Sequence, residues 1–226
     1  MIHPLTYVHP DAKIGPNVKI DPFTTIHKNV EIGEGTWIGS NVTIMEGARI
    51  GKNCRIFPSS VISAIPQDLK FKGEDTLCII GDNTTIRECV TINRGTVDRN
   101  QTRIGNNCLI MAYTHIAHDC EVGNSCIFSN NTTLAGHIVV GDCVVLAGLT
   151  AVQQFVRIGS YAFVTGGSLV RKDIPPLRKS RPRAPQLCRC QLGRPQAPRL
   201  QHRQDQPHTR YIPYTLCARQ IGRAHV

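Results

Sequence analysis

An apolar residue recurs at every sixth position of this chain from Val8 to Val170, and this period constrains the fold more than any other feature. Of the 28 positions reached by steps of six, which we call the repeat positions, 25 are apolar; the exceptions are Asp68, Glu74 and Asp98. An α-helix repeats every 3.6 residues and a single strand every two. The period therefore indicates a repeat architecture in which each unit buries its apolar residue against its neighbours.

Each repeat provides one large and one small side chain for the interior. Gly, Asn or Asp often follows the apolar residue, as in IGPNVK (14–19) and IGNNCL (104–109), and these residues favour tight turns. The side chain four positions later is usually small, as at Thr36, Ala48, Ser60, Thr84, Thr114, Thr132, Thr150 and Ala162. The pattern predicts an all-β fold, a parallel β-helix with three six-residue faces and about 18 residues per coil.

The net charge of +10 is confined to the last fifty residues. Residues 1–176, the expected β-helix domain, carry 15 Lys and Arg against 15 Asp and Glu, whereas residues 177–226 carry 11 basic residues and one acid. The tail has no amphipathic period, so we expect it to be irregular. A nucleic-acid-binding arm would be similarly basic. We instead expect a frameshift near Leu177 and no nucleic-acid partner, because IGRAHV (221–226) matches the translation of a common sequencing adapter.

Cysteine usage and the N-terminus indicate a reducing compartment. Four of the ten cysteines occupy the small interior position of a repeat, where a free thiol packs well: Cys54, Cys108, Cys120 and Cys126. The first ten residues have neither a basic segment nor an apolar core of a signal peptide, and no apolar run in the chain is long enough to cross a membrane. We therefore expect a soluble cytoplasmic protein with reduced thiols and no integral membrane segment.

Two insertions interrupt the repeat and leave the flanking register intact. Residues 63–79 separate Ile62 from Ile80, and residues 98–103 (DRNQTR) stand between two further repeats. Such insertions are loops that project from a finished scaffold. For the first loop, two interpretations remain: a lid beside a site, or a tolerated surface loop. We interpret 98–103 as a surface loop.

Stacking of each coil on the next brings ionisable side chains to one corner of the helix. The residues so gathered are His115, His118, Asp119, Gly136, His137 and Gln154. A histidine beside a carboxylate is a candidate general base, and a glycine N–H next to it can face a developing oxyanion. The chain has no nucleophile elbow, P-loop or dinucleotide fingerprint, which favours direct transfer aided by a base over a covalent intermediate.

A second column contains Asn130, Gly148 and Gly166, each one coil after the one before. Glycines in one column leave a shallow groove that suits an extended apolar ligand. Glycine also relieves crowding at a turn. The spacing alone leaves both interpretations open.

Six segments carry a resemblance to a known family: IPQDLKF (65–71), INRGTV (92–97), THIAHDCEVGN (114–124), NNTTLAGH (130–137), LTAVQQF (149–155) and VRKDIPP (170–176). Residues 1–176 resemble the acyl-acyl-carrier-protein:UDP-N-acetylglucosamine O-acyltransferases, which perform the first step of lipid A biosynthesis. The resemblance implies a left-handed β-helix and a homotrimer with active sites between subunits. It implies acyl carrier protein and UDP-N-acetylglucosamine as substrates, with no cofactor or metal.

The resemblance also assigns roles to individual residues. It makes His118 the general base on the 3-hydroxyl of glucosamine, with Asp119 as its support and Gly136 as the oxyanion N–H donor. Residues implied to line the substrate site are Asp68, Lys70, His115, His137 and Gln154. The column of Asn130, Gly148 and Gly166 becomes the acyl-chain groove, and a glycine at its far end implies a long 3-hydroxyacyl chain.

The chain departs from the family after Pro175 and Pro176, where relatives continue with a helical domain that residues 177–226 do not resemble. Gln153 and Asn93 stand where the family often has histidine. Three alternatives remain: the N-acyltransferase of the same pathway, which normally has a preceding N-terminal domain; a γ-class carbonic anhydrase with three histidines on zinc; and a structural β-helix without chemistry. We favour the O-acyltransferase: no separate domain stands before the repeat here, His115 and His118 are too close in sequence for the zinc pattern, and a structural helix would have no reason to gather histidines at one edge.

Overall fold

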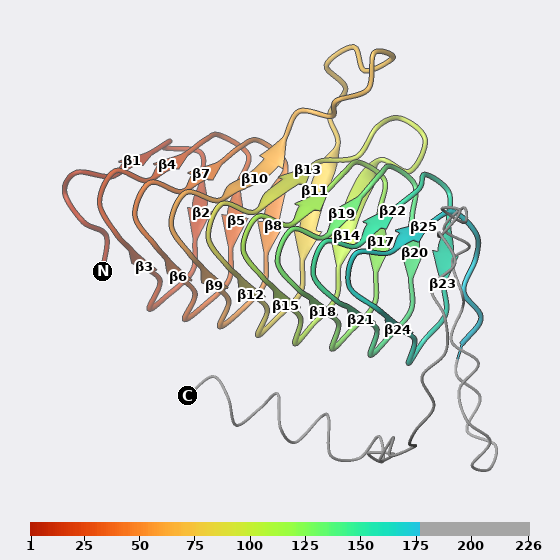
Figure 1. Ribbon diagram of the computed structural model, residues 1–226. Helices are drawn as coiled ribbons and strands as arrows, with labels where there is room; N and C mark the ends of the chain where they lie inside the picture. Colours follow the sequence, from red (N-terminus) through yellow and green to blue (C-terminus); the bar gives the residue numbers. More distant parts are fainter. Residues whose placement is uncertain (177–226) are drawn as a thin grey trace, which may run out of the picture. The chain divides into compact units, whose positions relative to one another are not determined.

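The computed structural model describes residues 1–176, which form a left-handed parallel β-helix of short strands, as the repeat and the resemblance predict (Figure 1). The tail expected at 177–226 lies outside the described residues. Successive strands occupy the three faces in turn, so each face is one parallel sheet. Nowhere in residues 1–176 does a helix of membrane-spanning length and hydropathy occur.

The three sheets are built as follows. The first contains β1 (Tyr7–Val8), β4 (Thr25–Ile26), β7 (Thr43–Ile44), β10 (Val61–Ala64), β13 (Thr91–Asn93), β16 (His115–Ile116), β19 (Thr133–Leu134), β22 (Ala151–Val152) and β25 (Leu169–Val170). The second contains β2 (Lys13–Ile14), β5 (Glu31–Ile32), β8 (Ala48–Ile50), β11 (Leu77–Ile80), β14 (Gln101–Ile104), β17 (Glu121–Val122), β20 (Val139–Val140) and β23 (Arg157–Ile158). The third contains β3 (Lys19–Ile20), β6 (Trp37–Ile38), β9 (Arg55–Ile56), β12 (Thr85–Ile86), β15 (Leu109–Ile110), β18 (Ile127–Phe128), β21 (Val145–Leu146) and β24 (Phe163–Val164).

The strand register confirms that both insertions leave the repeat intact. Regular coils pair positions that differ by 18, as in Thr25↔Thr43. The difference becomes 30 across the first insertion, where Val61 pairs with Thr91, and 24 across the second, where Thr85 pairs with Leu109. Both loops leave the same corner, between the first and second sheets, in consecutive coils (Figure 1).

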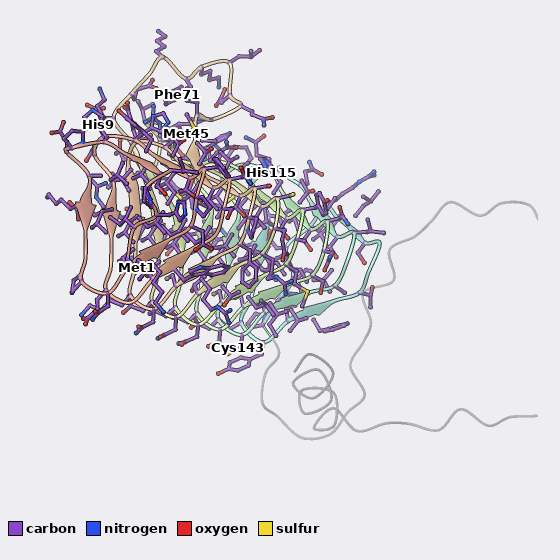
Figure 2. All side chains as sticks on the ribbon, turned by 90° about the vertical axis from the view of Figure 1, so that its left-hand side faces the viewer. Met1, His9, Met45, Phe71, His115 and Cys143 are labelled. Carbon is purple, nitrogen blue, oxygen red and sulfur yellow. The ribbon has the colours of Figure 1, made fainter. Side chains whose placement is uncertain are left out.

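The interior is filled by the repeat positions, as predicted. Of the 25 apolar ones, 23 are buried, and Val8 and Ile14 in the first coil are partly buried against the same core. The small interior positions are buried too, including all four of the cysteines expected there, and their thiols are free. Figure 2 looks at the coils from the N-terminal side and shows the side chains that fill them.

The corners use left-handed backbone. Asn17, Asn41 and Asn53 have φ values of 57°, 57° and 52°, and asparagine adopts this region more readily than most residues. Asp119 and His137 have the same conformation, with φ values of 57° and 62°. The turn geometry of the scaffold therefore sets where these two candidate site residues lie.

Ile86 on β12 provides a test of the register because its side chain is fully buried. An Ile86→Asp substitution places an unpaired carboxylate among apolar side chains and should lower the free energy of unfolding by several kcal/mol. The matched Ile86→Val substitution removes only one methyl group and should cost about 1 kcal/mol. Denaturant unfolding followed by circular dichroism measures both values, and equal stability of the two variants would contradict the inward register.

Candidate active site

His118 lies at the corner between the first and second sheets, in the turn that joins β16 to β17. Its main-chain carbonyl accepts a hydrogen bond from the His137 N–H at 3.1 Å, which places Gly136 directly over its ring. A Cβ atom on Gly136 would lie 2.6 Å from Cε1 and 2.8 Å from Nε2 of His118. Glycine is therefore required here, because any side chain would occupy the space of the imidazole.

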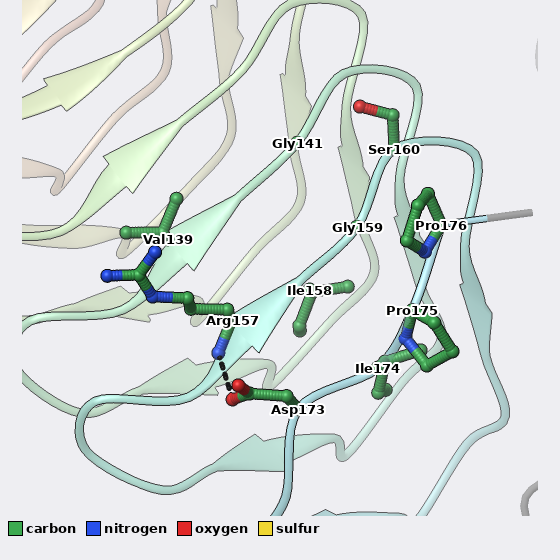
Figure 3. Close-up of a pocket in the computed structure, with 10 residues that line it drawn as sticks. All are labelled: Val139, Gly141, Arg157, Ile158, Gly159, Ser160, Asp173, Ile174, Pro175 and Pro176. Carbon is green, nitrogen blue, oxygen red and sulfur yellow. Dashed lines mark hydrogen bonds between the residues drawn. The ribbon is translucent and has the colours of Figure 1, made fainter.

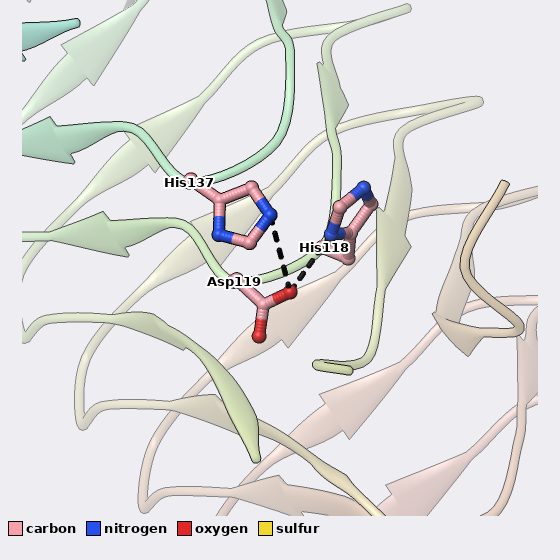
Figure 4. Close-up of side chains that lie close together, drawn as sticks. All are labelled: His118, Asp119 and His137. Carbon is pink, nitrogen blue, oxygen red and sulfur yellow. Dashed lines mark hydrogen bonds and ion pairs between the residues drawn. The ribbon is translucent and has the colours of Figure 1, made fainter. Parts of the chain in front are cut away.

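The imidazole of His118 is held by its neighbour in sequence. Nδ1 of His118 lies 2.8 Å from Oδ2 of Asp119, and both residues are buried (Figure 4). This contact assigns the proton of neutral His118 to Nδ1 and leaves the lone pair on Nε2. The predicted pairing of a histidine with a supporting carboxylate is present in the geometry.

Asp119 is fully buried and fully hydrogen-bonded. Its Oδ1 accepts the main-chain N–H groups of Thr96 at 3.0 Å and of Arg99 at 3.2 Å. Its Oδ2 accepts the Thr96 hydroxyl at 2.7 Å in addition to His118. Burial acts to raise the pKa of Asp119, but the hydrogen bonds from Thr96 and His118 outweigh it, so the pKa lies below its usual value. The carboxylate is therefore ionised at neutral pH.

Residues 98–103 lie at the surface, as interpreted, with Asp98, Asn100 and Arg103 exposed, but they also contribute contacts to the candidate site. The segment folds back toward the turn that carries His118 and Asp119. The Arg99 N–H donates to Asp119, and Oδ2 of Asp98 lies 3.1 Å from Nδ1 of His137. Thr96, just before it, contacts the carboxylate through both its N–H and its hydroxyl. Sequence reasoning missed these residues because an insertion lies outside the coil-stacking rule, and the resemblance of the INRGTV segment was the only available signal.

His137 completes the cluster from the next coil. Its ring stacks on Phe155 with centroids 4.8 Å apart and meets the ring of His118 edge-on at 5.0 Å. Nε2 of His137 is 3.9 Å from Oδ2 of Asp119 (Figure 4). The structure thus brings together His118, Asp119, Gly136 and His137 as the stacking rule predicts.

His115 lies three residues before His118 on β16 and faces a different partner. Its Nδ1 is 2.7 Å from the Thr91 hydroxyl, which sits one coil below. Burial, with a smaller contribution from repulsion by His118, lowers the pKa of His115. His115 is therefore neutral at neutral pH and can exchange hydrogen bonds with an uncharged polar ligand.

The remaining predicted substrate residues lie farther out. Within the first loop, the Asp68 carboxylate accepts a hydrogen bond from the Lys70 N–H at 2.9 Å. The same loop contacts the helix at Phe71, whose ring centroid lies 5.4 Å from the guanidinium carbon of Arg94. Within residues 1–176 no hydrogen bond or ion pair joins Asp68 or Lys70 to the histidine cluster. Gln154 is exposed in the coil above Gly136, where the N–H of the next residue bonds to the Gly136 carbonyl.

The glycine column has the predicted stacking. The Leu149 N–H bonds to the Asn130 carbonyl at 3.0 Å, and the Gly167 N–H bonds to the Gly148 carbonyl at 2.9 Å. A Cβ on Gly166 would lie 3.1 Å from the Gly148 oxygen, so the column is tight along the backbone. Gly166 is exposed and Gly148 partly exposed, so the upper part of the column has no side chains of its own.

A metal is the alternative occupant of the cluster. Ligand atoms of His118, Asp119 and His137 lie within 4.8 Å of one another, the one such group of three among residues 1–176. However, each Asp119 oxygen already accepts two hydrogen bonds, which occupies the four acceptor sites of a carboxylate. His115 is engaged with Thr91 instead of completing a set of three histidines. The geometry therefore favours a hydrogen-bonded base over a zinc centre.

An open hollow lies elsewhere, on the last coils of the helix (Figure 3). It is lined by β20, β23 and the 173–176 segment, where Oδ1 of Asp173 accepts the Arg157 N–H at 2.8 Å. None of the histidine cluster contributes to its walls. The hollow is therefore separate from the candidate active site.

Comparison with known proteins identifies the family. Residues 1–102 match the family described as the GMPPB C-terminal domain, and residues 101–136 match the bacterial transferase hexapeptide family of six repeats. The acyl-[acyl-carrier-protein]–UDP-N-acetylglucosamine O-acyltransferase of Xylella fastidiosa is 52% identical over 177 residues, which cover 78% of this chain and 67% of that protein. This chain belongs to the UDP-N-acetylglucosamine O-acyltransferase family.

Other members of the family agree with this assignment. The relative from Sulfurihydrogenibium sp., named in the same way, is 63% identical over 121 residues, covering 53% of this chain and 45% of that protein. The chain therefore spans only about half the length of some curated relatives it matches. The crystal structure of LpxA, a UDP-N-acetylglucosamine acyltransferase from Bacteroides fragilis, superposes with a TM-score of 0.76 at 50% identity, over 78% of this chain and 69% of that one.

Proposed function

We propose that this protein transfers a long-chain 3-hydroxyacyl group from acyl carrier protein to the 3-hydroxyl of UDP-N-acetylglucosamine, the first step of lipid A biosynthesis. The observation that carries the proposal is the His118–Asp119 pair beside Gly136, which leaves Nε2 of His118 free to take a proton. Membership of a family whose relatives bear the name of this activity supports the same substrates. A γ-class carbonic anhydrase, which needs three histidines on zinc, is disfavoured because the cluster holds only two histidines and His115 is hydrogen-bonded to Thr91 instead.

The reaction needs a base because a sugar hydroxyl is a poor nucleophile at neutral pH. Nε2 of His118 removes the proton as the 3-oxygen attacks the thioester carbonyl, and imidazole is the side chain most often used in this way. The tetrahedral intermediate then collapses, and the carbon–sulfur bond breaks. The imidazolium returns the proton to the departing thiolate of the carrier protein. Asp119 stays ionised and stabilises the imidazolium between these two steps.

Gly136 supplies the electrostatic stabilisation in this proposal. Within residues 1–176 its N–H donates to no protein acceptor, so it is available for the oxyanion of the intermediate. Because it lies over the His118 ring, a carbonyl oxygen bound there would leave the carbonyl carbon close to the sugar oxygen. A preorganised donor of this kind contributes about two to three orders of magnitude in kcat.

The proposal includes the remaining substrate contacts and the assembly. We assign Asp68, Lys70, His115, His137 and Gln154 to the binding of the nucleotide sugar and the acyl donor. Homotrimer formation is supported by large exposed apolar side chains at two corners: Phe155, which stacks on His137, and Tyr113 and Leu149, which lie beside the glycine column. The two substrates are a soluble carrier protein and a nucleotide sugar, so the proposal places the enzyme in the cytoplasm.

A panel of acceptors and donors tests the proposed function. The purified full chain should acylate UDP-N-acetylglucosamine and give a base-labile ester, detected by mass spectrometry, with a long-chain 3-hydroxyacyl carrier protein as donor. A 3-deoxy acceptor, which lacks the attacking oxygen, should give no product, and an acceptor with an amine in place of the hydroxyl distinguishes N-acyl transfer. The proposal would be refuted if no ester formed with any donor. It would also be refuted if the protein hydrated carbon dioxide, lost this activity on chelation and regained it with zinc.

A further inference from the structure

The segment between β13 and β14 donates hydrogen bonds to the carboxylate of Asp119. Thr96 contacts it twice, through its main-chain N–H at 3.0 Å and its hydroxyl at 2.7 Å, and Thr96 is itself buried. The same hydroxyl accepts the Asp98 N–H at 3.3 Å. Because an ionised carboxylate can only accept, the Thr96 hydroxyl donates its proton to Asp119 while one of its lone pairs accepts the Asp98 N–H.

The segment that carries Thr96 is held in place by its own contacts. The Gly95 N–H bonds to the Leu77 carbonyl, and the Gly95 carbonyl accepts the Thr76 hydroxyl at 2.6 Å. A Cβ on Gly95 would lie 2.3 Å from the main-chain nitrogen of Gln101, so only glycine permits this close return of the chain. Thr96 is therefore presented to Asp119 by a fixed turn that is anchored on both sides.

We propose that Thr96 is a positioning residue for the general base, and that the turn between β13 and β14 places it against Asp119. This inference rests on the proposed function, since it assigns Thr96 a task in the same reaction. Oδ2 of Asp119 is shared between the Thr96 hydroxyl and Nδ1 of His118. The hydroxyl fixes the rotation of the carboxylate, the carboxylate fixes the imidazole, and Nε2 of His118 is thereby aimed at the substrate. Catalytic side chains are commonly held in their productive geometry by hydrogen bonds from a supporting layer of residues.

Thr96→Val tests the proposal because it removes the hydroxyl and keeps the shape and the main-chain N–H. We expect kcat to fall about ten- to a hundredfold, because a misplaced catalytic group can cost about two orders of magnitude, with KM changed less than twofold. Thr96→Ser keeps the hydroxyl and should restore kcat to within a few-fold of the wild-type value. Thr24→Val is the matched control, since Thr24 is also buried and its hydroxyl makes one hydrogen bond of 2.8 Å, to the Gly39 carbonyl.

A second measurement reports on His118 without any turnover. The Nδ1 proton of His118, assigned by its absence from His118→Ala, should give a slowly exchanging proton resonance in ¹⁵N-histidine-labelled protein. Its exchange with water should become at least about tenfold faster in Thr96→Val, because hydrogen bonding is what protects such a proton. The exchange should be normal in Thr96→Ser and in Thr24→Val.

The two measurements separate the two proposals. Unchanged proton exchange in Thr96→Val would overturn the role of Thr96 whatever the effect on turnover, as would a Thr96→Val enzyme with wild-type kcat. A fall in kcat that Thr96→Ser fails to restore would also overturn it. If the wild-type protein transfers no acyl group, the proposed function fails, yet the exchange measurement still decides whether Thr96 holds the His118–Asp119 pair.

Discussion

His118→Ala is expected to lower kcat by about two to four orders of magnitude, with a smaller effect on KM. The substitution removes Nε2 of His118. Because Nδ1 is hydrogen-bonded to Asp119, Nε2 is the ring nitrogen that has a lone pair to accept the proton. The sugar hydroxyl would then have to lose its proton to water as the new bond forms. Asp119→Asn should cost less, because the imidazole remains but its orientation is disturbed. Steady-state kinetics with an acyl-carrier-protein donor provides both values.

The control for this prediction is a histidine in the turn of another coil, one position earlier in the turn than His118. His27 follows β4 as Ala117 follows β16, and within residues 1–176 its side chain takes part in no hydrogen bond or ion pair. His27→Ala should therefore have wild-type kcat. All variants are compared at the same oligomeric state, established by light scattering. A trimeric His118→Ala enzyme with near-normal turnover would show that another group acts as the base.

Gly166→Met is expected to shift the preferred acyl chain by several carbons. Position 166 is exposed at the end of the glycine column, so a methionine there would add four heavy atoms to the path proposed for the chain. Each methylene that loses its apolar contact costs about 0.8 kcal/mol, so denying a bound chain three or four carbons lowers kcat/KM by about two orders of magnitude. Shorter donors should react normally because they do not reach the obstruction.

A graded substitution makes this prediction sharper. Gly166→Ala adds one atom, 3.1 Å from the Gly148 oxygen, and should give a smaller shift in the same direction. The measurement is kcat/KM for a series of 3-hydroxyacyl carrier proteins that differ in chain length. An acyl preference that stays the same in both variants would show that the glycines of this column are turn residues and that the chain lies elsewhere.

The fold could be predicted because one period recurs from Val8 to Val170. The inward register follows from that period alone, and residues such as Ile86 and Phe128 are buried where it places them. The handedness could not be derived in this way, since a six-residue period is the same in either hand, and it came from the resemblance. The register across the insertions could be predicted because a loop between finished coils does not alter how the next coil stacks.

The candidate site could be predicted only where the stacking rule holds. The rule places Gly136 over His118 and His137 over Asp119, and the structure has both. It gives no information on Thr96 and Arg99, because a chain that leaves the coil can fold outward or back. Only the three-dimensional structure shows that the insertion returns to the carboxylate.

The most direct test of the account is a crystal structure of the protein with the product, UDP-3-O-(3-hydroxyacyl)-N-acetylglucosamine. The account predicts that the 3-oxygen of the sugar lies about 3 Å from Nε2 of His118, within hydrogen-bonding distance. The ester carbonyl should face the Gly136 N–H, and the acyl chain should follow the glycine column toward Gly166. A product bound with its ester away from His118, or bound only in the hollow beside Pro175, would contradict the account.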